Sequence, residues 1–517
     1  MTKRLLEQIE GLVVHSIRSF VRCVLTTAVQ VHAPWWPWSR QLHRTIASFV
    51  VALSEWPDNG LNGSRLLSLP NSFFSTLSTH HPIVQWRAPP NQSAAMPSPN
   101  SCASTTDQPS DTVLAHQPLA VALAGMVALA VAMGIGRFAF TPLLPMMLHD
   151  GVLTLAQGSW LATANYVGYL VGALGCMALP WVAPRARQVW HAARLARVGL
   201  AATVLLTLGM ALPVASAWPA LRFAAGVASA LVFLNVSVWC MLRLVALGKP
   251  ALGGLIFCGP GLGIVLSGLS ASAMVAWGWP AAAGWSVFGV LSVALCVAIW
   301  PVLQGHAVPP SAAKAAQGGG PALPGQGPLA RTGLTLAYGL AGLGYIVTAT
   351  FLPVIARAAL PVGSAWPDLF WPLFGAGVAM GAALTTRTPA AWDRRWLLLA
   401  AYALQAMAIV FTLVWPGTVG FALGSLLLGL PFTAITFYAL QEARRVWPAA
   451  GDSFPGLLTA AYGVGQIVGP PMVAWMLQHS ATQSQGFVYG LAVAAAALAL
   501  GAGLYAAMVW RWPLSAR

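Results

Sequence analysis

Acidic side chains are scarce in this chain. Its 517 residues include 11 Asp and Glu against 26 Lys and Arg, and charged residues make up 7% of the sequence, where a soluble domain has roughly 25%. Only five acids follow residue 116, and they stand apart from one another: Asp150, Asp368, Asp393, Glu442 and Asp452. Too few charges remain for a water-facing surface.

Neither the cysteines nor any common catalytic motif indicates a disulfide framework, a metal site or an active site. The six cysteines lack the spacing of a disulfide framework or a zinc site. The sequence has no phosphate-binding loop, no dinucleotide fingerprint and no nucleophile–base pair. We therefore expect no enzyme, no ATP-driven pump, no metal and no cofactor. The net charge of +15 does not indicate nucleic-acid binding, because no basic run with interleaved aromatic residues occurs.

Apolar sequence is what the chain has in abundance. Hydrophobic residues make up 58%, and the mean hydropathy is +0.72. From about residue 117 they form twelve stretches, most of them near the roughly 20 residues that a helix needs to cross a bilayer. Helices are expected because an open sheet would leave unpaired backbone groups in lipid. The stretches run approximately over 119–143, 159–182, 195–213, 219–241, 251–276, 281–303, 332–356, 366–386, 395–415, 418–441, 454–478 and 486–510.

Basic residues between these stretches fall on alternate loops. Fifteen lie after even-numbered stretches or in the C-terminal tail, and one, Arg357, lies on the other side. Short loops rich in Lys and Arg stay in the cytoplasm. The sequence thus predicts an all-α polytopic protein of the bacterial inner membrane with both termini cytoplasmic. The fifteen residues are Arg185, Arg187, Arg194, Arg197, Arg243, Lys249, Lys314, Arg331, Arg387, Arg394, Arg395, Arg444, Arg445, Arg511 and Arg517.

The first 116 residues have a different composition. Residues 88–116 are rich in Pro, Ser, Thr and Gln, which is typical of disorder. Near the start, apolar residues at helical spacing predict an amphipathic helix on the membrane surface; the alternative is an unfolded segment, with translation starting at Met96. We expect an extension (1–116), a first six-helix half (117–303), a flexible Gly/Pro/Ala/Gln-rich linker (304–330), a second half (331–512) and a cytoplasmic tail (513–517).

The two halves are related copies. Stretch 1 contains GIGRFAFTPLLP (134–145) and stretch 7 contains GLGYIVTATFLP (342–353), which match at a constant spacing of 208. Stretches 5 and 11 match at a spacing of 202, for example at Gly263 and Gly465. Twelve transmembrane helices in two pseudo-symmetric halves of the same polarity are the plan of a transporter that rocks one half against the other.

Four motifs resemble the YbfB/YjiJ branch of the major facilitator superfamily: GIGRFAFTPLLPMM, GSWLATANYVGYLVGAL, GPGLGIVLSG and GLLTAAYGVGQIVGPP. The resemblance covers about residues 117–512 and implies the major facilitator fold and a transporter, without naming a substrate. Arg222-x-x-x-Gly226 is similar to a motif linked to proton coupling in drug antiporters. Gly259-Pro260-Gly261-x-Gly263 is similar to the antiporter signature, with Leu255 in place of its leading glycine. The usual loop 2–3 motif lacks its acid.

Charged residues inside the membrane are costly and suggest function. Arg137 lies well inside stretch 1, where the resemblance implies a central cavity, so we expect it to bind a substrate anion; a structural or snorkelling arginine is the alternative. Arg222 is a candidate for coupling, with snorkelling again the alternative. Glu442, beside Arg444 and Arg445, is either a cytoplasmic ion pair or a proton relay.

Uncharged candidates complete the predicted site. Asn165, Tyr345 and Gln466 are expected to contact substrate, although buried amides also hold helices together. Gly259, Pro260 and Gly263 are expected to allow close packing and, in addition, gating.

A site whose fixed charges are all positive favours a small organic anion. The sequence therefore predicts a secondary transporter in the lipid bilayer with a small-molecule partner, proton coupling left open and no oligomer required. Proton-coupled export of drug-like compounds and a transport-dead membrane sensor are the alternatives.

Overall fold

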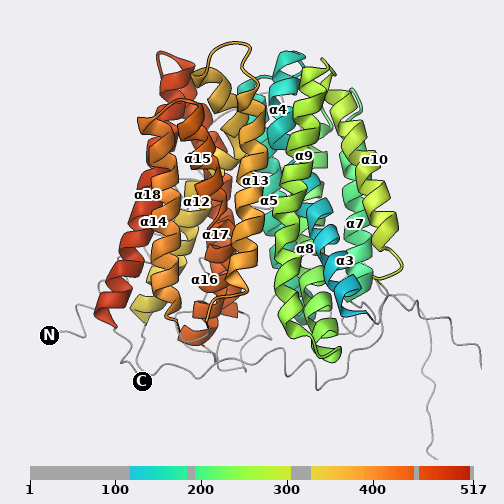
Figure 1. Ribbon diagram of the computed structural model, residues 1–517, viewed down its shortest axis with the longest axis vertical. Coiled ribbons are helices and arrows are strands. Elements are labelled where there is room, and N and C mark those ends of the chain that lie inside the picture. Colours follow the sequence, from blue (N-terminus) through green and yellow to red (C-terminus); the bar gives the residue numbers. More distant parts are fainter. Residues whose placement is uncertain (1–116, 183–191, 304–327, 390–391, 448–452, 513–517) are drawn as a thin grey trace, which may run out of the picture. The chain divides into compact units, whose positions relative to one another are not determined.

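The computed structural model describes residues 117–182, 192–303, 328–389, 392–447 and 453–512, all of which belong to one unit, Asp111–Arg517. The expected extension (1–116), residues 304–327 of the expected linker and the tail (513–517) lie outside the described residues. The described ranges contain twelve helices or broken helices that are long and apolar enough to cross a membrane, and no strand (Figure 1). The predicted fold class and the number of spans are confirmed.

The first six spans consist of α3 (Pro118–Leu129), η3 (Ala130–Ile135) and α4 (Phe140–His149), then α5 (Leu155–Val182), α7 (Ala192–Gly209), α8 (Trp218–Ala246), η4 (Pro250–Cys258) with α9 (Gly259–Ala276), and α10 (Ala281–Ile299). The second six consist of α12 (Pro328–Ala359), α13 (Trp366–Thr385), α14 (Arg394–Val414), α15 (Thr418–Gly429) with α16 (Phe432–Val446), α17 (Ser453–Gln478) and α18 (Gln483–Arg511).

Most of these bounds differ from the predicted ones by a few residues. The largest difference is at the end of span 1, where α4 continues to His149 although the apolar stretch was expected to end near residue 143. Pro145 lies inside α4 and does not end it, because neighbouring helices in a membrane protein can satisfy the backbone groups that a proline frees. Helix α12 begins at Pro328, inside the expected linker.

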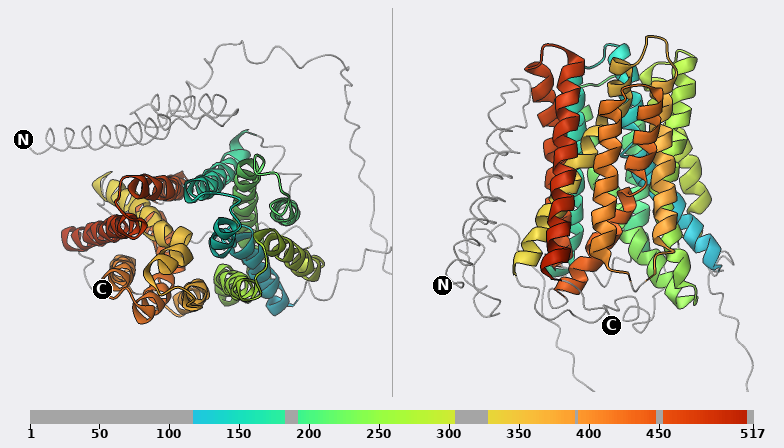
Figure 2. Two further views of the ribbon diagram at one scale, coloured as in Figure 1. Left: turned by 90° about the horizontal axis from the view of Figure 1, so that it is seen from above. Right: turned by 60° about the vertical axis from the view of Figure 1, so that its left-hand side comes forward.

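The six spans of each half form their own group, and the two groups meet mainly along three helix pairs (Figure 2). Helix α9 packs along α13, α5 packs along α17, and α4 contacts α12. Within the repeat, spans 5 and 11 are equivalent, and so are spans 2 and 8, so the first two pairs are copies of each other. We call the end of the bundle where odd-numbered spans begin the basic end, and the other the opposite end.

Glycine contacts reproduce the internal repeat. Gly134 of η3 faces Gly263 of α9 so closely that a Cβ on Gly263 would lie 2.8 Å from the Cα of Gly134. In the second half, Gly342 of α12 faces Gly465 of α17 in the same way, with 3.0 Å from a Cβ on Gly465 to the carbonyl carbon of Gly342. The glycines paired by sequence spacing thus allow the same backbone approach in both halves, which no larger residue permits.

Three spans change their helical form part-way. Span 1 passes from α3 through the π-helical η3 and a bend at 136–139 into α4; span 5 passes from the 3₁₀ segment η4 into α9; span 10 breaks between α15 and α16 at Pro431. Interruptions of this kind at membrane depth are tolerated where protein surrounds the backbone, and they often mark functional sites.

Candidate functional site

The bend in span 1 leaves backbone carbonyls without their usual helical partners. The amide of Gly136 donates five residues back, to the carbonyl of Val131 (2.8 Å). The amide of Thr141 donates only three residues back, to the carbonyl of Phe138 (3.1 Å). Carbonyls between these positions need partners from outside the helix, because a buried unpaired carbonyl costs about 1–3 kcal/mol.

Arg222 of α8 supplies those partners. Its Nη1 donates to the carbonyl oxygen of Gly136 (3.3 Å) and its Nη2 to that of Arg137 (3.1 Å). Its side chain is 2% exposed, so the snorkelling alternative is wrong. Asn165 of α5 donates from Nδ2 to the backbone oxygen of Arg222 (2.9 Å). Spans 1, 2 and 4 are therefore joined at the bend by one set of hydrogen bonds.

Arg137 extends from the same bend towards the second half. Its side chain is 3% exposed, and its Nη2 donates to Oε1 of Gln466 on α17 (2.7 Å). Gln466 in turn donates from Nε2 to the hydroxyl of Tyr345 on α12. The guanidinium lies 4.0 Å from the centre of the Tyr169 ring, and its Nε has no hydrogen-bond partner. The structure thus brings Arg137, Tyr345 and Gln466 together across the two halves.

Two further hydrogen bonds join the halves nearer the opposite end. Thr141 of α4 donates from Oγ1 to the carbonyl oxygen of Ala349 on α12 (2.7 Å). That carbonyl is four residues before Pro353, which has no N–H to pair with it. The hydroxyl of Tyr166 on α5 lies 2.9 Å from that of Thr350 on α12. These bonds must break before the halves can separate at this end.

The acids of the described chain are engaged elsewhere. Asp150 accepts from the amide of Ala281, and the other three pair with arginines: Asp368 with Arg357, Asp393 with Arg395, and Glu442 with Arg445. Asp452 lies outside the described residues. Within those residues, no carboxylate neutralises Arg137 or Arg222, so the centre of the molecule carries two buried positive charges without an ionic partner.

Glu442 belongs to a separate cluster at the basic end. Its carboxylate is 2% exposed and lies 3.6 Å from Nη1 of Arg445, and neither of its oxygens has a hydrogen-bond partner. Asp393 pairs with Arg395 in the same region: the Arg395 side chain is 2% exposed and that of Asp393 14%, and Arg395 donates both to Asp393 and to the carbonyl of Trp512 at the end of α18. Burial raises the pKa of Asp393, but the hydrogen bonds from Arg395 outweigh it, and the pKa lies below its usual value.

The three candidates of span 5 have a clear packing role. Gly259 and Gly263 face span 1 where a Cβ would meet the backbone at Met126 and Ala130. Pro260 lies in the first turn of α9, where its missing N–H costs nothing. These residues allow spans 1 and 5 to touch, which positions the bend that carries Arg137.

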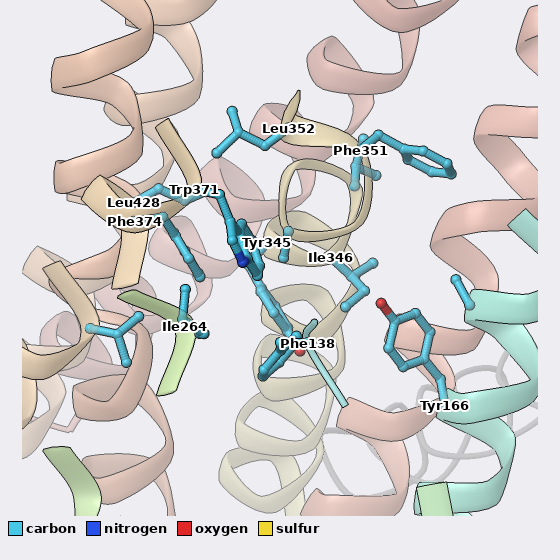
Figure 3. Close-up of a cluster of buried hydrophobic side chains, with 14 of the residues drawn as sticks. Phe138, Tyr166, Ile264, Tyr345, Ile346, Phe351, Leu352, Trp371, Phe374 and Leu428 are labelled. Carbon is cyan, nitrogen blue, oxygen red and sulfur yellow. The ribbon is translucent and has the colours of Figure 1, made fainter. Parts of the chain in front are cut away.

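Aromatic side chains surround Arg137 and Gln466 densely. Tyr345 contacts Phe432 of α16 edge to face (4.9 Å between ring centres) and stacks on Tyr462 of α17 (5.6 Å, 15° between planes). Figure 3 shows Phe138, Tyr345, Trp371 and Phe374 gathered together. Two of these tyrosines had a sequence signal. Tyr338 precedes Tyr345 by seven residues and Tyr462 precedes Gln466 by four, so each shares a helix face with a candidate residue.

Comparisons with known proteins agree with this architecture. The family described as "Uncharacterised MFS-type transporter YbfB" matches residues 129–506. The chain is similar to a chloramphenicol resistance protein of Streptomyces lividans, at 30% identity over 404 residues that cover 72% of this chain and 94% of the relative. Its fold is similar to the crystal structure of a mutant of the nucleoside transporter NupG, with a TM-score of 0.57 and 13% identity over 75% of this chain and 99% of that chain.

Proposed function

The chain belongs to the family of the MFS-type transporter YbfB, and from this premise we propose that it is a secondary transporter of a small organic anion. It works by alternating access in the bacterial inner membrane, with the basic end facing the cytoplasm. The orientation rests on the distribution of Lys and Arg between the loops. One copy of the chain contains the whole proposed site.

The charge of the site carries the proposal. Arginine side chains carry a permanent positive charge in proteins. Arg137 is buried between the halves, and it contacts the neutral Oε1 of Gln466 (2.7 Å) and the face of the Tyr169 ring. A buried charge without an ionic partner is costly. A carboxylate or similar anion entering between the halves relieves that cost, whereas a cation increases it.

Binding is an exchange of partners on Arg137. The substrate anion takes the place of Gln466 Oε1 and also reaches the unpaired Nε of Arg137, so the planar guanidinium can bind it in a bidentate manner. A hydrogen bond to a charged group contributes about 1.5–3 kcal/mol, against about 1 kcal/mol for a neutral pair. Gln466 and Tyr345, freed from Arg137, remain available to the polar edge of the substrate.

Substitution of Arg137 tests this function. Arg137→Gln should abolish anion counterflow in liposomes and the thermal stabilisation of the purified protein by anions, because the charge is gone. Arg137→Lys keeps the charge but loses the planar guanidinium that binds an anion in a bidentate manner, so this variant should bind anions roughly ten- to a hundredfold more weakly. Arg197→Gln is the matched control, because Arg197 contacts the carbonyl of Trp300 at the bundle edge. Unchanged anion affinity in Arg137→Gln, or stabilisation by cations only, would overturn the proposal.

A second candidate is proton-coupled export of drug-like compounds. The relative from Streptomyces lividans is named for chloramphenicol resistance, and the aromatic side chains around Tyr345 suit apolar compounds. Coupling would then use Glu442 at the basic end, since the acids of the described chain lie away from Arg137. Proton release on binding of an uncharged compound, absent in Glu442→Gln, favours this candidate; proton-independent anion counterflow favours the first.

A transport-dead sensor on the same fold is separated from both candidates by one measurement. A sensor is stabilised by its ligand but shows no counterflow in liposomes, whereas a carrier shows both.

A further inference from the structure

Three tyrosine rings form a continuous stack beside the proposed anion site. The Tyr338 and Tyr462 rings lie 4.6 Å apart at 25°, and the Tyr462 and Tyr345 rings lie 5.6 Å apart at 15°. The stack joins α12 to α17, and the hydroxyl of its last ring accepts the hydrogen bond from Gln466 that continues to Arg137. A flat apolar surface and a fixed positive charge are therefore adjacent.

The aromatic surface extends to both halves. The centre of the Tyr169 ring on α5 lies 4.0 Å from the Arg137 guanidinium carbon. The ring centres of Phe138, in the bend of span 1, and Phe432 lie 6.4 Å apart. Tyr169 and Tyr462 are only half-buried, whereas Tyr345 is buried. When the halves separate, Arg137 and Tyr169 move with the first half and the stacked tyrosines with the second, so all of them line one gap.

Several of the side-chain hydrogen-bonding groups around this gap are already paired, although Oδ1 of Asn165 has no partner. The hydroxyl of Tyr166 pairs with Thr350, the amide nitrogen of Asn165 with the backbone of Arg222, and the amide of Gln466 with Tyr345 and Arg137. A substrate with many hydroxyl groups would lose more hydrogen bonds to water than these groups could replace. A substrate with one charged end and an apolar body has few hydrogen bonds to water to lose on entering the site.

We propose that the substrate is an aromatic carboxylate, whose carboxylate binds Arg137 and whose ring packs against the tyrosine stack of α12 and α17. This inference rests on the proposed anion function and adds the class of the anion. A planar ring binds such a surface more tightly than burial of its apolar area alone would explain. Aromatic pairs attract each other in addition, which corresponds to about two- to tenfold in affinity.

Four matched probes separate the inference from the function on which it rests: benzoate, cyclohexanecarboxylate, acetate and benzamide. Affinity is measured by isothermal titration on the purified protein. We expect benzoate to bind about two- to tenfold more tightly than cyclohexanecarboxylate, acetate to bind weakest of the three acids, and benzamide not to bind. Equal affinity for benzoate and cyclohexanecarboxylate overturns the aromatic class and leaves the anion function standing. Equal affinity for benzoate and benzamide overturns the anion function, and binding of none overturns both.

Variants of the stack give a second readout. Tyr462→Leu should abolish the preference for benzoate over cyclohexanecarboxylate while cyclohexanecarboxylate still binds, and Tyr462→Phe should keep the preference because the ring remains. Tyr489→Leu is the matched control, since Tyr489 is exposed on α18 and pairs with Gln485. Melting of each variant in detergent checks that it is folded. A preference for benzoate that survives in Tyr462→Leu refutes the placement of the ring.

Discussion

Replacing Arg222 by lysine or methionine tests whether this residue holds the bend of span 1 or couples transport to protons. Its two hydrogen bonds, to the carbonyls of Gly136 (3.3 Å) and Arg137 (3.1 Å), join α8 to the bend. Lysine keeps the charge but has no planar fork, so it can hold one of these carbonyls well but not both. Methionine fills similar volume and donates nothing.

The size of the effect follows from those two bonds. Loss of one charge-assisted hydrogen bond in Arg222→Lys should cost about 1.5–3 kcal/mol of stability. Arg222→Met leaves two buried carbonyls unpaired, at about 1–3 kcal/mol each, and removal of a buried charge offsets part of that cost. Both variants should therefore melt at a lower temperature than the wild type, and methionine should lower the melting temperature more, because the offset is only partial.

Counterflow with equal pH on both sides of the liposome separates the two roles, because exchange of substrate needs no proton movement. A bracing role predicts that counterflow falls together with stability, since the bend that presents Arg137 is loosened. A coupling role predicts normal counterflow and a loss of gradient-driven transport alone. Arg197→Lys is the control, because Arg197 holds a single carbonyl, that of Trp300 (2.9 Å), at the bundle edge. Unchanged melting with normal counterflow in Arg222→Met would refute the bracing role.

Three other predictions concern the halves, the basic end and the orientation. Thr141→Val removes the hydrogen bond from α4 to α12, so the opposite end should open more often. A loss of about 1.4 kcal/mol corresponds to a roughly tenfold faster reaction of a cysteine placed at Val354 with an impermeant maleimide. An unchanged reaction rate contradicts this prediction. The ion pair of Asp393 with Arg395 should stabilise the protein fully near neutral pH, and this stabilisation should be lost as the pH falls through the lowered pKa of Asp393, below about 4. Asp393→Asn should therefore remove this part of the pH dependence of the melting temperature, which the wild type retains. Reporter fusions at Arg394 should report cytoplasm and those at Asp150 periplasm, and the reverse result would contradict the orientation.

Part of the candidate site was predictable from local sequence. An arginine surrounded by apolar residues in a predicted span is conspicuous, and the repeat spacing of 208 aligns Arg137 with Tyr345. Gln466 was a candidate because it interrupts a glycine-rich apolar stretch. These patterns did not show which residues are in contact. Arg137 and Gln466 are 329 positions apart, and neither segment contains a feature that identifies the other as its partner. The role of Arg222 was also open, because a position one turn inside a helix fits an outward and an inward side chain equally well.

The sequence by itself determined the class of structure: the number of spans, their approximate ends and the relation between the halves. The physical reason is that insertion into a bilayer depends on the summed apolarity of each stretch of about 20 residues, which is a local property of the chain. Only the tertiary structure decided which side chains meet, because that depends on how each helix is rotated and how closely its neighbours approach. The contact of Arg222 with the bend, the carbonyl of Ala349 bound by Thr141 and the stack on Tyr462 all depend on that packing.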